Sequence, residues 1–345
     1  MLKQRSVLVV LGLSALLICV ACGSGDGADP EVGASSGERK FLSVGTAPVG
    51  GAFFVVGSAI AEVLDSNSGE HGWKVTAETT KGSQENIRRI VAGEIELALA
   101  NSAISYFASR GSERWGEAAD IRAVMTLAPN VALFIAPEGG VKTIADLKGR
   151  RVYLGPSGAG FDYFIRPLLE GHGLAWEDLI AVHGGQAQAV DYLRDGSAVA
   201  AFLGGAVPTA SITQAATSRK IHFIPYNDEV IERLTNKYLF FRRATIPAGT
   251  YRGLDADYHG LDVGSMHLIT SGSADEELIY QLTKTLYENR EQVVAKHPAG
   301  KAINPKNAAR DTGTLFHPGA RRYYREIGIW SGDTLEDRPA GDETN

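Results

Sequence analysis

Apolar and polar residues follow two alternating periods along the chain from Phe41 onward. The first short apolar run, residues 40–45, predicts a strand. Directly after it, apolar residues recur at helical spacing and form one stripe: Phe53, Val56, Ile60, Val63 and Leu64. A helical period that follows a strand predicts an amphipathic helix with one face packed on the sheet.

The alternation of strands and helices continues through the next segments. Residues 73–80 alternate as a half-buried strand does, and Ser83 is the expected N-cap of a helix that Gly93 closes. Residues 95–102 predict the next strand. The order strand, helix, strand, helix, strand predicts a mainly parallel sheet with helices on its faces.

A similar order recurs in residues 151–205, where two further strands each lead through a glycine turn into a helix. We therefore predict an α/β fold of two lobes, each a mainly parallel sheet flanked by helices, with a ligand cleft between the lobes. The first lobe comprises residues 40–130 and 264–332, and the second comprises residues 131–263. The helical pattern in residues 274–294 would close the first lobe.

The two ends of the chain are predicted to lie outside this fold. Lys3 and Arg5 precede an apolar run that ends at Ala21, so residues 1–21 resemble an export signal. Ala21 followed by Cys22 resembles a lipoprotein cleavage box, in which Cys22 is acylated; because Cys19 departs from that pattern, plain secretory cleavage stays the alternative. Residues 22–39 predict a flexible linker, and residues 333–345 predict an acidic tail without structure.

Composition excludes several classes of function. The 345 residues are 44% hydrophobic and 21% charged, with a formal net charge of −6 and no basic cluster, so nucleic acid is not an expected partner. Both cysteines lie in the first 22 residues, and the eight histidines are scattered without metal-ligand spacing. No nucleotide-binding fingerprint or nucleophile motif occurs. We therefore expect no metal, no cofactor and no catalytic residue, and the protein is not expected to be an enzyme.

The glycine loops that precede the first helix of each predicted lobe carry the functional hypothesis. Ligands of open α/β sheets bind beyond the carboxyl ends of the strands, and the start of a helix presents unpaired amides that favour an anion. The alternative is that these loops are ordinary turns between strand and helix. Two further turns follow strands at the same edge, at Asn101 with Ser102 and at Gly204 with Gly205. Phe53 and Phe161 could form walls, and arginines on the helices are candidate counter-charges, of which Arg166 is one.

A family resemblance rests on six blocks in the same order: GTAPVGGAFFVVGSAIAEVL, TKGSQENIRRIVAGEIELALANS, DLKGRRVYLGPSGAGFD, FLGGAVPTASITQAA, IPAGTY and HPGARRYYREIGIW. Over about residues 41–330 the chain resembles the TAXI family of solute-binding proteins. These are the extracytoplasmic receptors of one branch of the tripartite ATP-independent periplasmic (TRAP) transporters.

The resemblance implies a two-lobed periplasmic-binding-protein fold of the second type, which closes on a small organic anion such as a glutamate-like amino acid or a dicarboxylate. It also implies delivery to TRAP membrane subunits that an ion gradient drives, and a location outside the cytoplasm. The contacts that it implies are Gly51, Ala52, Phe53, Asn101, Ser102, Ser157, Gly158, Gly160 and Phe161. The family more often has Gly-Thr-Tyr where this chain has Gly51-Ala52-Phe53, so a less polar solute, or one held more by backbone amides, is expected here.

Two other functions are compatible with such a fold. The chain could be a receptor that binds a solute and signals to a kinase. It could also be a periplasmic enzyme; however, porphobilinogen deaminase-like enzymes attach their cofactor to a cysteine, and the mature chain offers none except Cys22.

Overall fold

The computed structural model describes residues 40–49, 51–112 and 114–330. The predicted export signal, the predicted acylation site Cys22 with the predicted linker, and the predicted acidic tail lie outside the described residues. None of the helices in the described ranges combines the length and the apolar character that crossing a bilayer requires.

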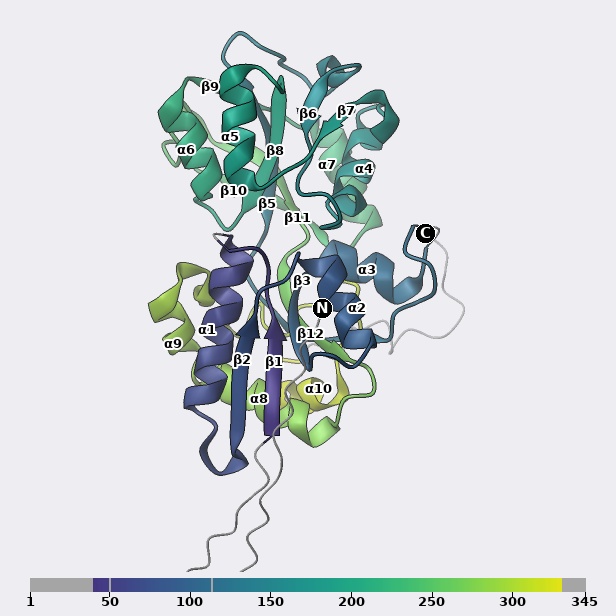
Figure 1. Ribbon diagram of the computed structural model, residues 1–345, viewed down its shortest axis with the longest axis vertical. Coiled ribbons are helices and arrows are strands. Elements are labelled where there is room, and N and C mark those ends of the chain that lie inside the picture. Colours follow the sequence, from purple (N-terminus) through teal and green to yellow (C-terminus); the bar gives the residue numbers. More distant parts are fainter. Residues whose placement is uncertain (1–39, 50, 113, 331–345) are drawn as a thin grey trace, which may run out of the picture. The chain divides into compact units, whose positions relative to one another are not determined.

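The first sheet is formed by strands from both ends of the described chain (Figure 1). Its strands, in spatial order, are β2 (Trp73–Glu78), β1 (Lys40–Gly45), β3 (Leu97–Asn101), β12 (Met266–Ser271) and β4 (Ile121–Thr126). β1 is parallel to β2 and β3, whereas β12 is antiparallel to both of its neighbours.

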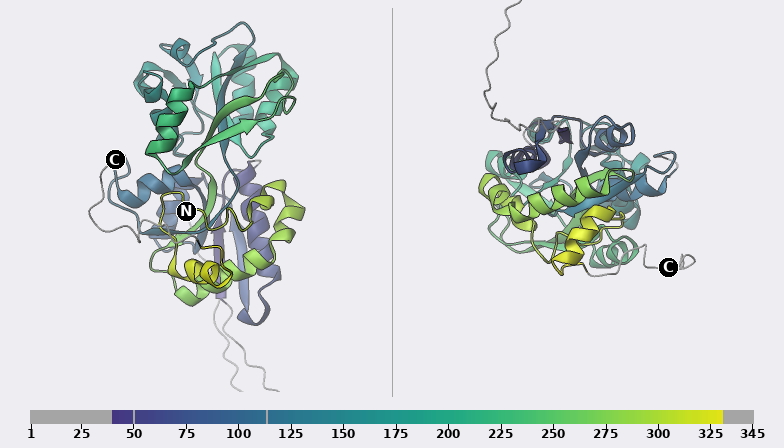
Figure 2. Two further views of the ribbon diagram at one scale, coloured as in Figure 1. Left: turned by 180° about the vertical axis from the view of Figure 1, so that it is seen from behind. Right: turned by 90° about the horizontal axis from the view of Figure 1, so that it is seen from below.

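Side-chain alternation along β3 divides the helices between the two faces of this sheet. Leu97 and Leu99 belong to one apolar cluster, and Ala98 and Ala100 belong to another. The leucine face packs against α1 (Ala52–Ser66), α8 (Glu276–Glu288), α9 (Arg290–Lys296) and α10 (Pro318–Glu326). The alanine face, which has less side-chain volume, packs against α2 (Ser83–Val91) and α3 (Ser102–Arg110). Figure 2 shows α8, α9 and α10 in the foreground when the molecule is seen from behind.

The second sheet contains the strands between the two ends. In spatial order they are β10 (Phe241–Ile246), β11 (Tyr258–Val263), β5 (Val131–Pro137), β8 (Ala200–Gly205), β6 (Arg151–Tyr153) and β7 (Ile180–Val182), and β9 (Ile221–Ile224) also pairs with β5. β6 is parallel to β7 and β8, and the other pairs are antiparallel. The helices of this part are α4 (Asp162–Gly171), α5 (Gln186–Asp195), α6 (Ala210–Ser218) and α7 (Asp228–Lys237). Short 3₁₀ turns complete the fold at Gly69–His71, Ala145–Leu147, Trp176–Asp178 and Pro298–Ala302.

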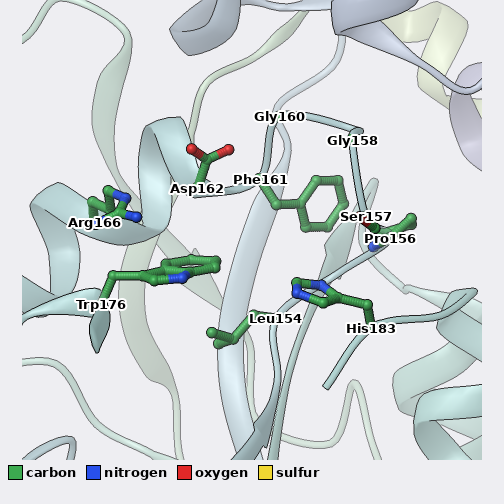
Figure 3. Close-up of a pocket in the computed structure, with 10 residues that line it drawn as sticks. All are labelled: Leu154, Pro156, Ser157, Gly158, Gly160, Phe161, Asp162, Arg166, Trp176 and His183. Carbon is green, nitrogen blue, oxygen red and sulfur yellow. The ribbon is translucent and has the colours of Figure 1, made fainter. Parts of the chain in front are cut away.

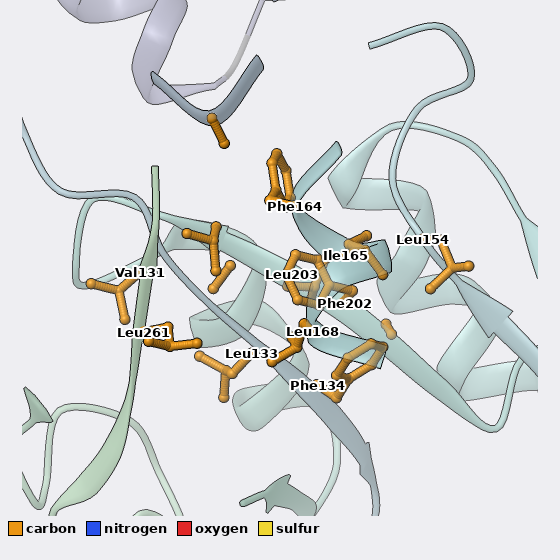
Figure 4. Close-up of a cluster of buried hydrophobic side chains, with 14 of the residues drawn as sticks. Val131, Leu133, Phe134, Leu154, Phe164, Ile165, Leu168, Phe202, Leu203 and Leu261 are labelled. Carbon is orange, nitrogen blue, oxygen red and sulfur yellow. The ribbon is translucent and has the colours of Figure 1, made fainter. Parts of the chain in front are cut away.

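Helix α4 is fixed on the second sheet by its apolar face. Phe164, Ile165 and Leu168 are buried, and the ring of Phe164 lies 6.0 Å from that of Phe202 on β8 (Figure 4). Phe202 in turn contacts Phe134 on β5, at 4.9 Å between ring centroids. Because interiors are closely packed, these rings fix the position of the helix and of the loop that enters it.

The chain passes between the two sheets twice, from β4 into β5 and from β11 into β12. The two crossing segments are hydrogen-bonded to each other, since the Val263 amide donates to the Asn130 carbonyl at 3.0 Å and the Met266 amide donates to the Ala128 carbonyl at 2.9 Å. The buried Asp262 carboxylate joins them further, because it accepts from the amides of Asn130 and Gly264 and from the Ser265 hydroxyl. Two short crossing segments of this kind are typical of a hinge.

The predicted fold class is confirmed, with a refinement of the sheets. Parallel pairs occur where strand, helix and strand follow one another, in β1 to β3 and in β6 to β8. The strands that carry the chain between the sheets add antiparallel pairs, so both sheets are mixed. We keep residues 40–130 with 264–330 as the first lobe and residues 131–263 as the second.

Two predicted helix assignments are tested by these bounds. The one helix predicted in residues 274–294 is two helices, α8 and α9, which meet at Asn289, and both pack on the first sheet. Ser83 is not an N-cap, because Gly82 has that position; the Ser83 hydroxyl accepts a hydrogen bond from the Asn101 amide at 3.0 Å instead.

Candidate functional site

A cavity of about 190 Å³ lies beside the loop that connects β6 to α4 (Figure 3). The residues that line it are Leu154, Pro156, Ser157, Gly158, Gly160, Phe161, Asp162, Arg166, Trp176 and His183. All of them belong to the second lobe. Four of the predicted contact residues, Ser157, Gly158, Gly160 and Phe161, are therefore brought together at one cavity.

The glycines of this loop are required by its backbone. Gly155, Gly158 and Gly160 have φ values of +93°, +75° and +89°, a region that other residues rarely adopt. A side chain at Gly155 would overlap the ring of Phe161, and one at Gly160 would lie 2.8 Å from Cδ1 of Ile104 in the first lobe. The loop thus packs closely on the ring of Phe161. At Gly160, which has no side chain, it contacts Ile104 of the other lobe.

The start of α4 presents unpaired backbone donors at this cavity. Its N-cap residue, Phe161, provides no side-chain cap. Among the described residues, no acceptor bonds the amides of Gly160, Phe161 or Asp162. Such a helix start carries a partial positive charge and favours an anion or another acceptor.

The two charged side chains of the cavity are already paired. Asp162 Oδ2 lies 3.2 Å from Arg114 Nη1 of the first lobe, and Arg166 Nη1 donates to Glu177 Oε1 at 2.8 Å. The guanidinium of Arg166 also lies 5.0 Å from the ring centroid of Trp176. Arg166 Nε is enclosed and has no hydrogen-bond partner within the described ranges, so it is one more donor without an acceptor.

His183 follows the edge strand β7 and adds a polar ring. Its Nδ1 lies 2.9 Å from the Gly155 carbonyl. Because a carbonyl oxygen can only accept, we assign the proton to Nδ1, and Nε2 of the neutral ring is then an acceptor. No described residue bonds Nε2.

The first glycine loop does not reach this cavity. Gly51 is the N-cap of α1, and Ala52 and Phe53 form its first turn and are half-buried. No side chain caps α1, and its first turn has no acidic residue. Gly51 has a φ of −91° and space for a side chain, so its conformation does not require glycine. The cavity beside the loop from β6 to α4 is thus not shared by the two loops.

Asn101 and Ser102 hold the crossing between the lobes. Asn101 Oδ1 accepts from the Ala103 amide at 2.9 Å, and its Nδ2 donates to the Gly264 carbonyl at 2.7 Å. The Ser102 amide donates to the Ser265 carbonyl at 2.9 Å. Both side chains are buried, so this turn does not line the cavity.

Gly204 and Gly205, at the end of β8, are likewise buried and away from the cavity lining. A side chain at Gly204 would overlap Ala132 of β5, and its carbonyl accepts from Gln186 Nε2 at 3.1 Å. Close approach of two strands explains glycine at this position.

Sequence reasoning missed Trp176 and His183 as cavity residues. His183 directly follows a strand at the same edge of the sheet as the glycine loop, so the rule that selected Ser157 could have selected it. Trp176 lies in a 3₁₀ turn before β7, and only the packing of α4 places it at the cavity. Within the described residues, no group of three or more His, Cys, Asp or Glu side chains could hold a metal ion.

A model of the NMT1-like family matches residues 44–328. A solved protein of Bordetella bronchiseptica RB50 is 15% identical, with a TM-score of 0.50, and the match covers 86% of this chain and 90% of that chain. A Xanthomonas citri protein bound to chloride ion is 9% identical, with a TM-score of 0.50 and coverage of 83% and 95%. The alkanesulfonate-binding protein SsuA from Xanthomonas axonopodis pv. citri, bound to MOPS, is 16% identical, with a TM-score of 0.47 and coverage of 83% of each chain. The fold is that of type II periplasmic binding proteins.

Proposed function

We propose that the chain, which belongs to the NMT1-like family, is an extracytoplasmic solute-binding protein that captures a small organic anion for a membrane transporter. The observation that carries the proposal is the start of α4, which leaves amides unpaired at the wall of a cavity in a two-lobed fold with a hinge.

The helix starts of this molecule differ in whether a side chain caps them. Helices α3, α8 and α10 begin with a side-chain cap, from Asn101, Asp275 and His317 respectively. Helices α1 and α4 follow the glycine loops and have no such cap, but α2, α5, α6, α7 and α9 also lack one, so the missing cap alone does not single them out. What distinguishes α4 is the cavity beside its first turn. A helix start without its own acceptor favours an external one. We propose that Ser157, Gly158, Gly160 and Phe161 bind the solute, and that Gly51, Ala52 and Phe53 meet it when the lobes close.

In finer detail, we propose a TAXI-type receptor of a TRAP transporter, anchored outside the cytoplasm by an acylated Cys22 and delivering its solute to TRAP membrane subunits. The six resembling sequence blocks support this assignment. Genes for multi-span membrane subunits beside the gene of this chain would favour transport over signalling to a kinase.

In this mechanism, the solute shifts the population of the protein from the open to the closed state of the lobes. The lobes open and close about the two crossing segments, and a solute that contacts both lobes only in the closed state stabilises that state. The hydrogen bond between Val263 and Asn130 joins the two crossing segments, so we expect them to move together.

The test is a thermal melting series with small organic anions, together with mass spectrometry of molecules that co-purify with the folded protein. A bound anion at about 100 times its Kd stabilises the folded state by about 2.7 kcal/mol and raises Tm. Ser157→Asp and Gly51→Asp place a carboxylate where the solute anion is expected and should remove the shift. Ser273→Asp is the matched control, since Ser273 is an exposed serine just before the capped helix α8.

Gly160→Asp is a poor variant for this purpose, because its strained backbone and its contact with Ile104 would disturb the fold itself. If no anion raises Tm and nothing co-purifies, the proposed function is wrong. If a co-purifying molecule is chemically converted during incubation, the protein is an enzyme.

A further inference from the structure

The walls of the second-lobe cavity are unusually rich in planar groups. The rings of Phe161, Trp176 and His183 lie around one space, and Leu154 adds an aliphatic side chain (Figure 3). The volume of about 190 Å³ lies below the roughly 300–1,000 Å³ of sites for drug-sized ligands. A cavity of about 150 Å³ in another protein holds one benzene molecule, although that cavity is closed and apolar whereas this one is open to solvent and has polar groups in its wall. The space therefore suits one six-membered ring with a small substituent.

The charges around the cavity limit what can occupy it. Asp162 is paired with Arg114, and Arg166 is paired with Glu177, so neither lining side chain offers an uncompensated charge. A solute with two carboxylates would place the second among Phe161, Trp176 and Leu154, where no counter-charge compensates its lost hydration. A solute with one carboxylate avoids this cost.

A single carboxylate has donors available beside the rings. Phe161 contributes both a ring to the wall and an unpaired amide, and the amide of Asp162 follows it. Arg166 Nε is a further donor without a partner, on the residue whose guanidinium lies over Trp176. The groups that bind a ring and those that bind a carboxylate thus come from the same short stretch.

We infer that the solute of this cavity is a carboxylate carried on a single aromatic ring. The inference rests on the proposed function and specifies its substrate class. The ring packs between Phe161 and Trp176, and the carboxylate accepts from the start of α4. His183 Nε2, an acceptor in the neutral ring, favours a solute whose ring carries a hydroxyl group.

Calorimetric titration with four probes tests the inference: 4-hydroxybenzoate, benzoate, cyclohexanecarboxylate and succinate. Benzoate is expected to bind about tenfold or more tightly than cyclohexanecarboxylate, which has a similar size but no flat face, and succinate is expected to bind most weakly. 4-Hydroxybenzoate should bind more tightly than benzoate.

Substitutions of two lining residues, Trp176 and His183, test whether they cause the preference for aromatic carboxylates. Trp176→Leu should weaken benzoate binding about tenfold, whereas Trp176→Phe, which keeps a ring, should weaken it less than threefold. The matched control is Trp330→Leu in the first lobe, since Trp330 is also partly buried and also has an arginine, Arg325, near its ring. It should leave benzoate binding within twofold. His183→Leu should abolish the preference for 4-hydroxybenzoate over benzoate.

Two outcomes would overturn the inference. One is benzoate binding no more tightly than cyclohexanecarboxylate or succinate, which includes no binding of benzoate at all. The other is a Trp176→Leu protein, folded by its melting curve, that binds benzoate as the unmodified protein does. If an aliphatic acid co-purifies and raises Tm, the aromatic assignment fails while the proposed receptor function stands.

Discussion

The turn that begins α3 and the loop that begins α4 both follow the carboxyl end of a buried strand, and both are rich in small residues. At α3, the Asn101 side chain caps the helix and bonds the crossing segment at Gly264. At α4, no side chain caps the helix, three successive amides have no acceptor within the described part of the chain, and a cavity lies alongside. The turn at Asn101 and Ser102, which is bonded to the crossing segment, is called the joint below. The loop before α4 is open to a ligand.

Position in the sheet therefore does not by itself identify a binding site. The rule that ligands bind at the carboxyl ends of strands selects both regions equally. Hydrogen bonds separate them in part: the amides of Ser102 and Ala103 at α3 have acceptors within the protein, although the buried Ser102 hydroxyl has none among the described residues. Variants of the closed joint should therefore change stability, and variants of the open loop should change binding.

The largest effect is expected from Asn101→Ala. The substitution removes the cap of α3 and leaves the Gly264 carbonyl and the Ala103 amide buried without partners. The expected loss in the free energy of unfolding is about 3 kcal/mol, measured by urea denaturation. Asn101→Asp keeps the oxygen that caps Ala103, but it buries a charge and sets an acceptor against the Gly264 carbonyl, so it should cost at least as much. A loss below about 1 kcal/mol for Asn101→Ala would mean that the turn is not the joint described here.

Lowering the pH to 5 is expected to lower the free energy of unfolding by about 2 kcal/mol, through a buried histidine near the same joint. His267 of β12 is fully buried, its Nε2 lies 2.8 Å from Ser105 Oγ, and burial lowers its pKa to about 3. The unfolded chain binds a proton at this histidine below about pH 6.5, whereas the folded protein does so only near pH 3. Stability that is complete above pH 6.5 is therefore lost as pH falls from 6.5 toward 3.

At pH 5 this loss amounts to about 2 kcal/mol, from about 1.4 kcal/mol for each pH unit below 6.5. The measurement is the free energy of unfolding of the unmodified protein and of His267→Gln at pH 7 and pH 5. Gln keeps a polar group near Ser105 but does not titrate, so its stability should fall less between the two values. If the free energy of unfolding falls equally in both proteins, His267 is not buried in its neutral form as described.

The sequence alone was sufficient for the alternation of strands and helices and for the second glycine loop, because both depend on local patterns. The leucine and alanine faces of β3 follow from side-chain alternation, and the positive φ values at Gly155 and Gly158 explain the glycines of the loop. The antiparallel strands β5, β11 and β12 could not be derived in this way, since pairing over long sequence separation depends on tertiary packing. The role of Asn101 was hidden for the same reason: its partner Gly264 lies far along the chain.

The smallest effect is expected within the open loop itself, where a glycine is needed by the backbone alone. Gly158 has a φ of +75°, and no atom lies within 4 Å of the position that a Cβ would occupy. Gly158→Ala should therefore cost about 1 kcal/mol of unfolding free energy, the strain of the left-handed conformation. Gly51→Ala in the first loop is the matched control, since its φ of −91° suits alanine; it should be neutral or stabilising by up to about 1 kcal/mol. Urea denaturation of the two variants measures the difference. A cost for Gly158→Ala as large as that for Asn101→Ala would mean that the loop is packed as tightly as the joint, and the contrast between the two regions would fail.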